Sequence, residues 1–342
     1  MIPQVLTQIQ SGQILSEEQM YDAVSSIMEG QWSNEQISAF LMGLSVRGES
    51  VAEITGAARV MREKALPISA PENAVDCCGT GGDKSGTYNI STAVAIVAAA
   101  CGVPVAKHGN RSASSKSGAA DVLEALGINL DVEQDKLEEA IKRFNFAFLM
   151  APRHHAAMKY VVPVRQALGI RTIFNVLGPL SNPAKTQFQL LGVFDKKLLV
   201  PIAQVLQKLG TQTAWVVHGS DGLDEITTTG ETYVAKLQNG KITEEILTPN
   251  DFGLHTANAQ DLTGGEPDVN ARALLDVMNG KKSAYRDIVL ANCAAVLMVS
   301  EKAADLKAAM QLASQAIDSG RALALLNDYK NYTIEHGKKH SS

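Results

Sequence analysis

Two consecutive units, each an apolar run followed by a polar loop and a second apolar stretch of helical length, occupy residues 74–126. In the first unit, AVDCC precedes a glycine-rich loop and the apolar stretch 91–101. In the second, residues 103–106 precede a loop rich in serine and lysine, and residues 117–126 follow. Strand–loop–helix units in succession are typical of a parallel sheet covered by helices. The sequence therefore predicts an α/β fold.

The chain beyond this segment contributes further elements to such a sheet. Alternating or continuous apolar residues predict strands at 74–78, 103–106, 146–150, 189–194 and 214–218, and helices at 91–101, 117–126, 133–143, 196–209, 270–279, 285–299 and 302–318. Residues 232–249 are predicted to form a β-hairpin, because Asn239-Gly240 tolerates the positive φ angles of a type I′ turn. The final residues, EHGKKHSS, are predicted to be a solvated tail.

The first 65 residues or so contain helical signals only. Ser16–Gln19, Ser33–Gln36 and Ser50–Glu53 each match the capping box, in which two side chains satisfy free amides at a helix start. A chain of 342 residues favours two domains. We expect a small all-α domain over 1–66 and, over 67–342, a larger α/β domain whose central, mostly parallel sheet is flanked by helices. Proline-rich residues 160–185 do not suit a simple βαβ unit, and part of them is expected to return to the helical domain.

The loop after the first predicted strand has the composition of an anion site. Glycines at 79, 81, 82 and 86 let backbone amides converge, and a helix that begins near Ser91 adds free N–H groups and a favourable dipole. The same glycines would also suit a plain strand-to-helix turn. The spacing matches neither the G-x-x-x-x-G-K-[ST] loop of nucleotide hydrolases nor the G-x-G-x-x-G dinucleotide motif.

The loop after the second predicted strand is cationic and hydroxyl-rich. Lys107, Arg111 and Lys116 stand among four serines, a composition that suits a phosphate group. Loops at the carboxyl ends of neighbouring parallel strands share one crevice, so the two loops together predict a substrate with two separated phosphate groups. His108 lies between the cations and is the one residue we consider as a general base; orienting a substrate or capping the loop are equally good readings.

Asp224 and Glu225 follow the predicted strand 214–218. Such a pair is often a charged surface turn. A pyrophosphate-bearing substrate needs a hard cation, however, and adjacent carboxylates suit Mg²⁺. We therefore interpret the pair as a magnesium site.

Charge and cysteine usage narrow the partners and the compartment. The chain has 31 basic and 36 acidic residues, a net charge of −5, which does not favour nucleic acid or an anionic membrane. Its four cysteines lack C-x-x-C spacing and are expected to be small buried side chains in a reducing compartment. We find neither a signal peptide nor an apolar stretch of ~18 residues. We expect a cytoplasmic protein with no nucleic-acid or membrane partner.

Five segments together resemble the anthranilate phosphoribosyltransferases, the tryptophan-pathway family within the nucleoside-phosphorylase-like fold. They are GTGGD at 79–83, YNIST at 88–92, KHGNRSASSKSG at 107–118, VRQALGIRTIFNVLGPLSNPA at 164–184 and GLDEIT at 222–227. The resemblance extends from the helical start to about residue 325. It implies transfer of the phosphoribosyl group of phosphoribosyl pyrophosphate to anthranilate, with Mg²⁺, by a homodimer formed through the helical domain.

The same resemblance implies the site residues. The sugar donor would be bound by Gly79, Gly82, Asp83, Thr87, Asn89, Ile90, Ser91, Thr92, Lys107, His108, Gly109, Asn110, Arg111, Ser112, Ala113, Ser114, Ser115 and Ala119. Mg²⁺ would be bound by Ser91, Asp224 and Glu225, and anthranilate by Gly79, Asn110 and Arg165. A guanidinium at Arg165 also suits the acceptor chemically, because it can bind a carboxylate through two parallel hydrogen bonds.

Other functions agree less well with the residues. A pyrimidine nucleoside phosphorylase would share the fold but has a Lys-His-Ser-Thr-Gly-Gly type loop, whereas this loop begins Cys78-Gly79-Thr80. A non-enzymatic relative that binds nucleic acid would need a basic surface, which the net charge does not favour. A dinucleotide-dependent oxidoreductase would need the glycine spacing that is missing here.

Overall fold

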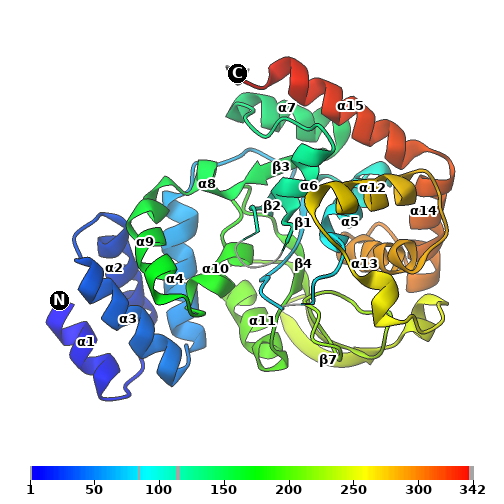
Figure 1. The fold of residues 1–342 in the computed structure, drawn as a ribbon. Helices are drawn as coiled ribbons and strands as arrows, with labels where there is room; N and C mark the ends of the chain where they lie inside the picture. Colours follow the sequence, from blue (N-terminus) through cyan, green and yellow to red (C-terminus); the bar gives the residue numbers. More distant parts are fainter. Residues whose placement is uncertain (1, 84, 113–115, 339–342) are drawn as a thin grey trace.

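The computed structural model describes residues 2–83, 85–112 and 116–338. Figure 1 shows a helical end on the left and a larger sheet-containing body. The helical end contains α1 (Ile2–Gln10), α2 (Glu17–Met28), α3 (Asn34–Arg47) and α4 (Val51–Lys64), which we call the bundle. All three predicted capping boxes are present at the starts of α2, α3 and α4. The predicted all-α start is therefore confirmed.

The body is built on a sheet of seven strands in the order β3-β2-β1-β4-β5-β6-β7 within the described residues. The strands are β1 (Val75–Gly79), β2 (Val105–Gly109), β3 (Phe146–Met150), β4 (Phe188–Gly192), β5 (Thr213–Gly219), β6 (Thr232–Gln238) and β7 (Lys241–Leu247). β1 to β5 are parallel, and the β6–β7 hairpin adds two antiparallel strands at one edge. Asn239 and Gly240 both have positive φ, as the predicted type I′ turn requires. The predicted mostly parallel sheet is confirmed.

Helices cover both faces of the sheet. In chain order the remaining helices are α5 (Ile90–Ala100), α6 (Ala119–Ala125), α7 (Gln134–Phe144), α8 (Ala151–His154), η1 (Ala156–Tyr160), α9 (Val162–Leu168), α10 (Phe174–Leu180), η2 (Lys196–Leu198), α11 (Leu199–Lys208), η3 (Pro249–Phe252), η4 (Ala259–Leu262), α12 (Pro267–Met278), α13 (Ala284–Val299), α14 (Leu306–Asp318) and α15 (Arg321–His336). α5 and α13 pack on one face of the sheet, and α11 packs on the other. Among the residues described, we find no helix that is both long enough and apolar enough to span a bilayer.

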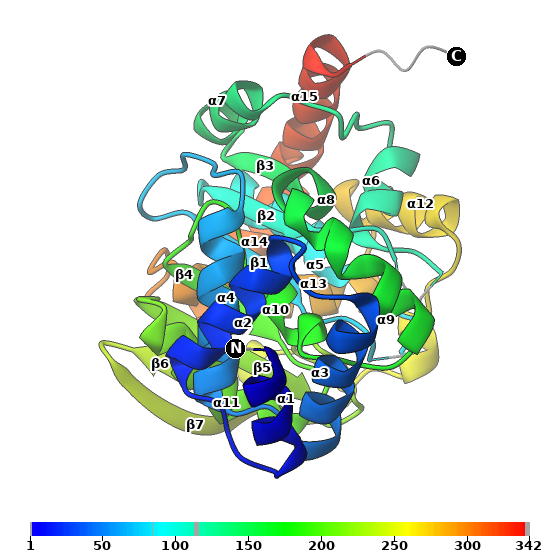
Figure 2. The ribbon, with the colours of Figure 1, turned by 90° about the vertical axis from the view of Figure 1, so that its left-hand side faces the viewer.

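Two hydrophobic cores lie on the two faces of the sheet, and successive strand residues alternate between them. Leu190 belongs to the core beneath α5 and α13, whereas Leu191 belongs to the core beneath α11. The second core continues without a break into the bundle. Residues 161–180, which we call the crossing segment, contribute α9 and α10 to it. Figure 2 shows α9 beside α3, and the two helices are in contact.

The C-terminal part of the chain differs from the prediction. Residues 321–336, for which we expected no helix, form α15, and Tyr329 and Tyr332 on it are buried against the first core. Glu335 and His336, expected in a solvated tail, belong to this helix. The backbone amide of Lys338 donates to Asp131 at 2.9 Å. The helix has its own apolar face, which our reading of the sequence overlooked.

Candidate active site

The carboxyl ends of β1 and β4 support the acidic pair. Both strands end in glycine, and the backbone of Asp224 lies directly over them. A Cβ atom on Gly192 would come 1.5 Å from the carbonyl oxygen of Asp224, and one on Gly79 would come 2.2 Å from its Oδ2. Glycine is therefore required at both strand ends, because any side chain there would displace the Asp224 backbone or carboxylate.

The glycine-rich loop and the acidic pair enclose one cavity of about 500 Å³. Backbone N–H of Gly81 donates to Oδ2 of Asp224 at 2.6 Å, which joins the loop after β1 to the loop after β5. Gly81 and Gly82 have φ of 68° and 75°, in the left-handed region that glycine adopts at little cost. The cavity is lined by these predicted residues: Gly79, Gly82, Asp83, Thr87, Asn89, Ile90, Ser91, Asp224 and Glu225.

The two carboxylates have raised pKa values. Burial, followed by the nearby charge of Asp83, raises the pKa of Asp224 to about 6. Burial, followed by the charge of Asp224, raises the pKa of Glu225 to about 8, although a backbone hydrogen bond from Ser91 opposes this shift. Both groups are held in an environment that disfavours negative charge. A bound cation would remove that penalty.

The residues fit a divalent cation, but only as part of its coordination shell. Within the described chain no group of three or more His, Cys, Asp or Glu side chains could hold a metal ion. Asp224, Glu225 and Ser91 all line the cavity and would supply oxygen atoms. Mg²⁺ is typically bound by one or two carboxylates together with water and substrate phosphates. The donor set therefore suits a metal that arrives with a phosphorylated substrate.

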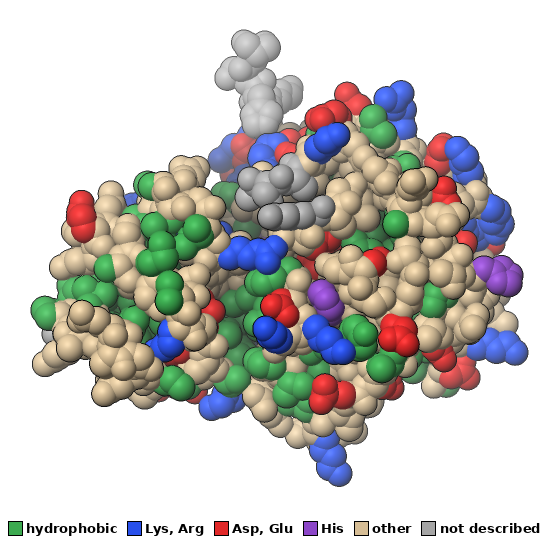
Figure 3. Space-filling view, turned by 60° about the horizontal axis from the view of Figure 1, so that its bottom comes forward, with side chains coloured by type: hydrophobic (Ala, Val, Ile, Leu, Met, Phe, Trp, Pro, Cys, Tyr) green, Lys and Arg blue, Asp and Glu red, His purple; other side chains and the backbone are tan. Residues whose placement is uncertain are grey.

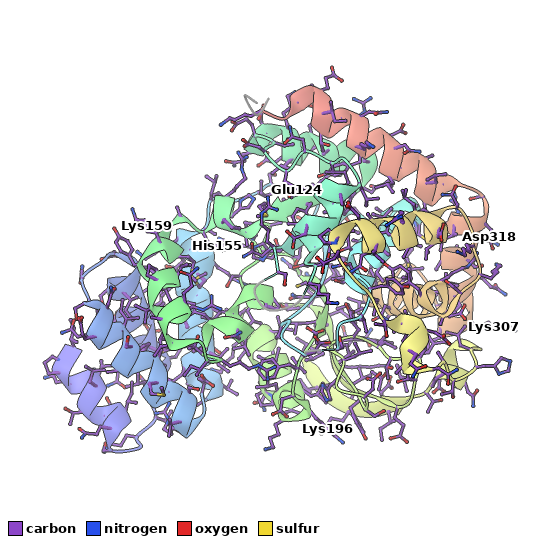
Figure 4. The ribbon with its side chains drawn as sticks, in the orientation of Figure 1. Glu124, His155, Lys159, Lys196, Lys307 and Asp318 are labelled. Atoms are coloured by element: carbon purple, nitrogen blue, oxygen red, sulfur yellow. The ribbon has the colours of Figure 1, made fainter. Side chains whose placement is uncertain are left out.

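Several predicted donor-binding residues lie elsewhere in the structure. Lys107, predicted in a loop, instead belongs to β2 and is buried, with its Nζ donating to the carbonyl of Cys77 at 2.7 Å. Arg111 is exposed and forms ion pairs with Asp121 and Glu124 of α6. Figure 4 labels Glu124, which lies on the α6 side of the body. Among the described residues that line the cavity, Lys116 supplies the positive charge.

The remaining predicted donor residues that the structure describes do not line the cavity. Thr92 is buried in α5, and its Oγ1 has no hydrogen-bond partner within the described residues. Gly109 ends β2, Asn110 and Ser112 follow it, and Ala119 begins α6. Ala113, Ser114 and Ser115 lie outside the described residues. The roles predicted for all of these residues stay predictions.

His108 is part of a buried cluster of three histidines. Its ring packs edge-on against His155, with 5.2 Å between centroids, and its Nδ1 lies 3.2 Å from the carbonyl oxygen of Gly178. Burial, then His155 and His154, lowers the pKa of His108 to about 3, and burial lowers that of His155 to about 4. A neutral His108 donates from Nδ1 to Gly178. A pKa this low makes it a weak base at neutral pH.

The crossing segment borders the glycine-rich loop. The Arg171 guanidinium donates to the carbonyl of Gly82 and lies over the Phe194 ring, 3.9 Å from its centroid. Arg165 lies on α9 of the same segment and is partly buried, which lowers its pKa. No ion pair of Arg165 occurs in the described part of the chain. Arg165 is not in the cavity wall, whereas Gly79, which is also an acceptor candidate, lines the cavity.

Figures 3 and 4 show the junction of the helical end and the body. In Figure 3 charged side chains of both signs gather near the middle of one face, between the two parts. In Figure 4 the labelled His155 lies between the bundle and the sheet.

Reasoning from the sequence missed one wall of the cavity. Thr263, Gly264, Gly265 and Asn270 line it, although they are distant in sequence from the other lining residues. The sequence did contain a signal for this wall: Gly264-Gly265 stand just before Pro267, and proline is favoured in the first turn of a helix, so a loop that ends at a helix start was recognisable there. The sequence also gave no sign that His155 would contact His108.

Comparisons with known proteins agree with this architecture. The model of the glycosyl transferase family α/β domain matches residues 71–323, and that of its helical bundle domain matches residues 3–65. Anthranilate phosphoribosyltransferases of Rhodospirillum rubrum and Azospirillum brasilense are each 55% identical to this chain; the matches cover 93% and 96% of it and 92% of each relative.

Solved structures give the same result. The crystal structure of anthranilate phosphoribosyltransferase from Thermus thermophilus has a TM-score of 0.91 and 41% identity, covering 96% of this chain and 99% of that one. The Saccharomyces cerevisiae enzyme in complex with PRPP and Mg has a TM-score of 0.89 and 29% identity, covering 98% of both chains. With both family models matched in order and half of its residues shared with such relatives over nearly its whole length, this chain belongs to the anthranilate phosphoribosyltransferases of the glycosyl transferase family.

Proposed function

We propose that this protein transfers the phosphoribosyl group of 5-phospho-α-D-ribose 1-diphosphate to the amino group of anthranilate. The products are N-(5-phosphoribosyl)anthranilate and pyrophosphate, in tryptophan biosynthesis. One observation carries the proposal: a single cavity combines a glycine-rich loop, a helix start and two adjacent carboxylates whose pKa values are raised. The names of the relatives and of the solved structures agree with this chemistry.

The sugar donor binds at the strand ends. Gly82, Gly86 and Thr87 of the glycine-rich loop line the cavity together with the start of α5, and their backbone N–H groups bind phosphate oxygens. Lys116, at the end of the second loop, adds one cation to the wall. The buried Lys107 opposes part of the effect of burial: its charge lowers the pKa values of Asp224 and Glu225, which burial raises, and so favours their charged forms.

Asp224, Glu225 and Ser91, which line the cavity, are the residues that would hold Mg²⁺. When bound it supplies fixed positive charge that stabilises the leaving pyrophosphate. The raised pKa values support this assignment, because the carboxylates are built into a place where they are poorly solvated without a cation.

Anthranilate binds from the side of the crossing segment. Arg165 is a partly buried guanidinium without an ion pair in the described chain, which suits it to bind the carboxylate of the acceptor. Asn110 and Gly79 lie on the sheet side of this path, at or just beyond the ends of β2 and β1. His108 is neutral at physiological pH and orients the acceptor rather than removing its proton.

The reaction proceeds with inversion at C1 of the ribose. The bond from C1 to pyrophosphate breaks while the amine nitrogen bonds to the opposite face, through a transition state with oxocarbenium character. Loop amides and the α5 start stabilise the negative charge that develops on pyrophosphate. The crossing segment holds the weakly nucleophilic amine close to C1, which contributes through positioning.

A homodimer through the helical end and a cytoplasmic location complete the proposal. α3 exposes Met42 and Val46, which are 41% and 80% exposed, and α9 exposes Val162. Exposed apolar side chains on adjacent helices support a self-association surface. Light scattering of wild type and Val46→Asp tests it: a monomeric wild type contradicts the dimer.

Fluorescence tests the activity directly. The emission of anthranilate should fall when the donor sugar, Mg²⁺ and this protein are present together, and should persist when any one is left out. Phosphorolysis of thymidine serves as the comparison reaction. Thymidine cleavage without any loss of anthranilate fluorescence would establish a nucleoside phosphorylase instead.

A further inference from the structure

A segment distant from the glycine-rich loop in sequence closes one side of the cavity. Residues 263–265, which we call the strap, lie between η4 and α12. Thr263 forms an antiparallel bridge with Thr87, and the backbone N–H of Gly264 donates to the carbonyl of Gly86 at 2.8 Å. The strap therefore fixes the path of the loop backbone just before α5.

This contact depends on the missing side chain of Gly264. A Cβ atom there would lie 2.5 Å from the carbonyl oxygen of Thr87 and 2.8 Å from the backbone nitrogen of Tyr88. Both are backbone atoms, which cannot rotate away as a flexible side chain can. A side chain at position 264 would therefore push the strap away from the loop.

Asn270 joins the strap to the loop through its side chain. It lies on α12, is 1% exposed and uses both ends of its carboxamide. Its Oδ1 accepts from the backbone N–H of Gly265 at 2.7 Å, and its Nδ2 donates to Oδ1 of Asn89 at 2.8 Å. A buried amide with both ends bonded has one orientation, because turning it over would place two donors or two acceptors face to face.

The orientation of Asn270 determines that of Asn89. Because Nδ2 of Asn270 donates to it, the carboxamide of Asn89 must direct Oδ1 to α12, and its own Nδ2 donates to the carbonyl of Ser117 at 3.2 Å. Tyr285 holds the Asn89 backbone, with its Oη donating to the carbonyl at 3.1 Å. Asn89 immediately precedes α5 and lines the cavity.

We propose that Asn270 is a positioning residue for the sugar donor, acting through Asn89 and the strap. This inference rests on the proposed function. Asn270 fixes the side chain at the start of α5 and holds the strap against the loop, so that the phosphate-binding amides are in place before the donor arrives. Preorganised groups bind without the cost of ordering them on association.

Kinetics of Asn270→Ala test this role. We expect the KM for the donor to rise about tenfold, as for the loss of one buried hydrogen bond, with little change in the KM for anthranilate. Asn89→Ala alone should also raise the donor KM. In the Asn89→Ala background, Asn270→Ala should raise the donor KM by less than about twofold more, because the effects of residues that act as one unit are not additive. An equal effect in both backgrounds, or no effect in either, would overturn the proposal.

Asn279→Ala is the matched control. Asn279 directly follows α12, is exposed, and among the described residues its Nδ2 donates to the carbonyl of Leu275 in that helix at 2.7 Å. The variant should leave both KM values unchanged. If Asn270→Ala does not fold, the equally large Asn270→Asp, which places an oxygen against Oδ1 of Asn89, carries the same test. If the wild type does not turn over anthranilate, the proposed function fails; calorimetric titration with the donor and Mg²⁺ then still tests whether Asn270 controls donor binding.

Discussion

Replacing Asp224 with Asn removes a charge that the fold disfavours in the absence of metal. The pKa of this carboxyl is about 6, compared with an ordinary value of 3.8, and burial is the main cause. A pKa raised by folding means that the folded state favours the protonated form. The stability associated with that proton is fully present below pH ~4 and is lost as the pH rises through about 6. The amide of the Asp224→Asn variant has no such proton to lose, so the stability of that variant should not follow this curve.

The magnitude follows from the two pKa values, which differ by about 2. This difference corresponds to roughly 3 kcal/mol, since one pKa unit corresponds to about 1.4 kcal/mol. Metal-free Asp224→Asn should therefore gain stability relative to wild type between pH 4.5 and pH 8, up to this limit. In a chain of this size the gain amounts to a Tm shift on the order of 5 °C.

Thermal unfolding in EDTA at several pH values measures this difference. Asp328→Asn is the matched control, because Asp328 is exposed on α15, away from the cavity. Adding Mg²⁺ with the donor sugar should raise the Tm of the wild type and have little effect on Asp224→Asn. A wild-type-to-variant difference that stays constant from pH 4.5 to pH 8 would refute the electrostatic reasoning.

Three further outcomes are expected. Arg165→Ala should raise the KM for anthranilate at least tenfold, because the guanidinium that binds the anthranilate carboxylate is lost. The donor KM should stay nearly unchanged, and Arg165→Lys should have an intermediate effect. Steady-state fluorescence assays measure both KM values. Gly192→Ala should abolish turnover and lower the Tm, since its Cβ would lie 1.5 Å from the Asp224 carbonyl. Because burial depresses the pKa values of His108 and His155 to about 3 and about 4, stability should be complete above pH ~6.5 and decline as the pH falls towards 4. His155→Gln should flatten that decline in a pH series of melting curves.

Local signals in the sequence predicted much of the fold. The three capping boxes are formed by residues three apart, and the Asn239-Gly240 turn needs only its own two φ angles. Such features do not depend on distant parts of the chain. The parallel strands were recognisable for a similar reason, because strands buried on both faces are apolar along their length.

The direction of side chains and the long-range contacts were not predictable in this way. The composition of the second loop predicted that Lys107 and Arg111 act together, yet Lys107 is buried in β2 and Arg111 forms ion pairs with α6. The strap contacts a loop more than 170 residues earlier, as Thr263 pairs with Thr87. No pattern within either segment reports that contact, which exists only once the fold has brought the two together.

Because the second core is continuous, the helical end should not fold when it is separated from the rest of this enzyme. Side chains from the bundle, the crossing segment and one sheet face form a single apolar cluster. A fragment limited to residues 1–66 would leave the inner side of α4 in water, where α10 and α11 now cover it. The fragment should therefore aggregate rather than fold as an independent domain. Calorimetry of the whole chain should show a single unfolding transition.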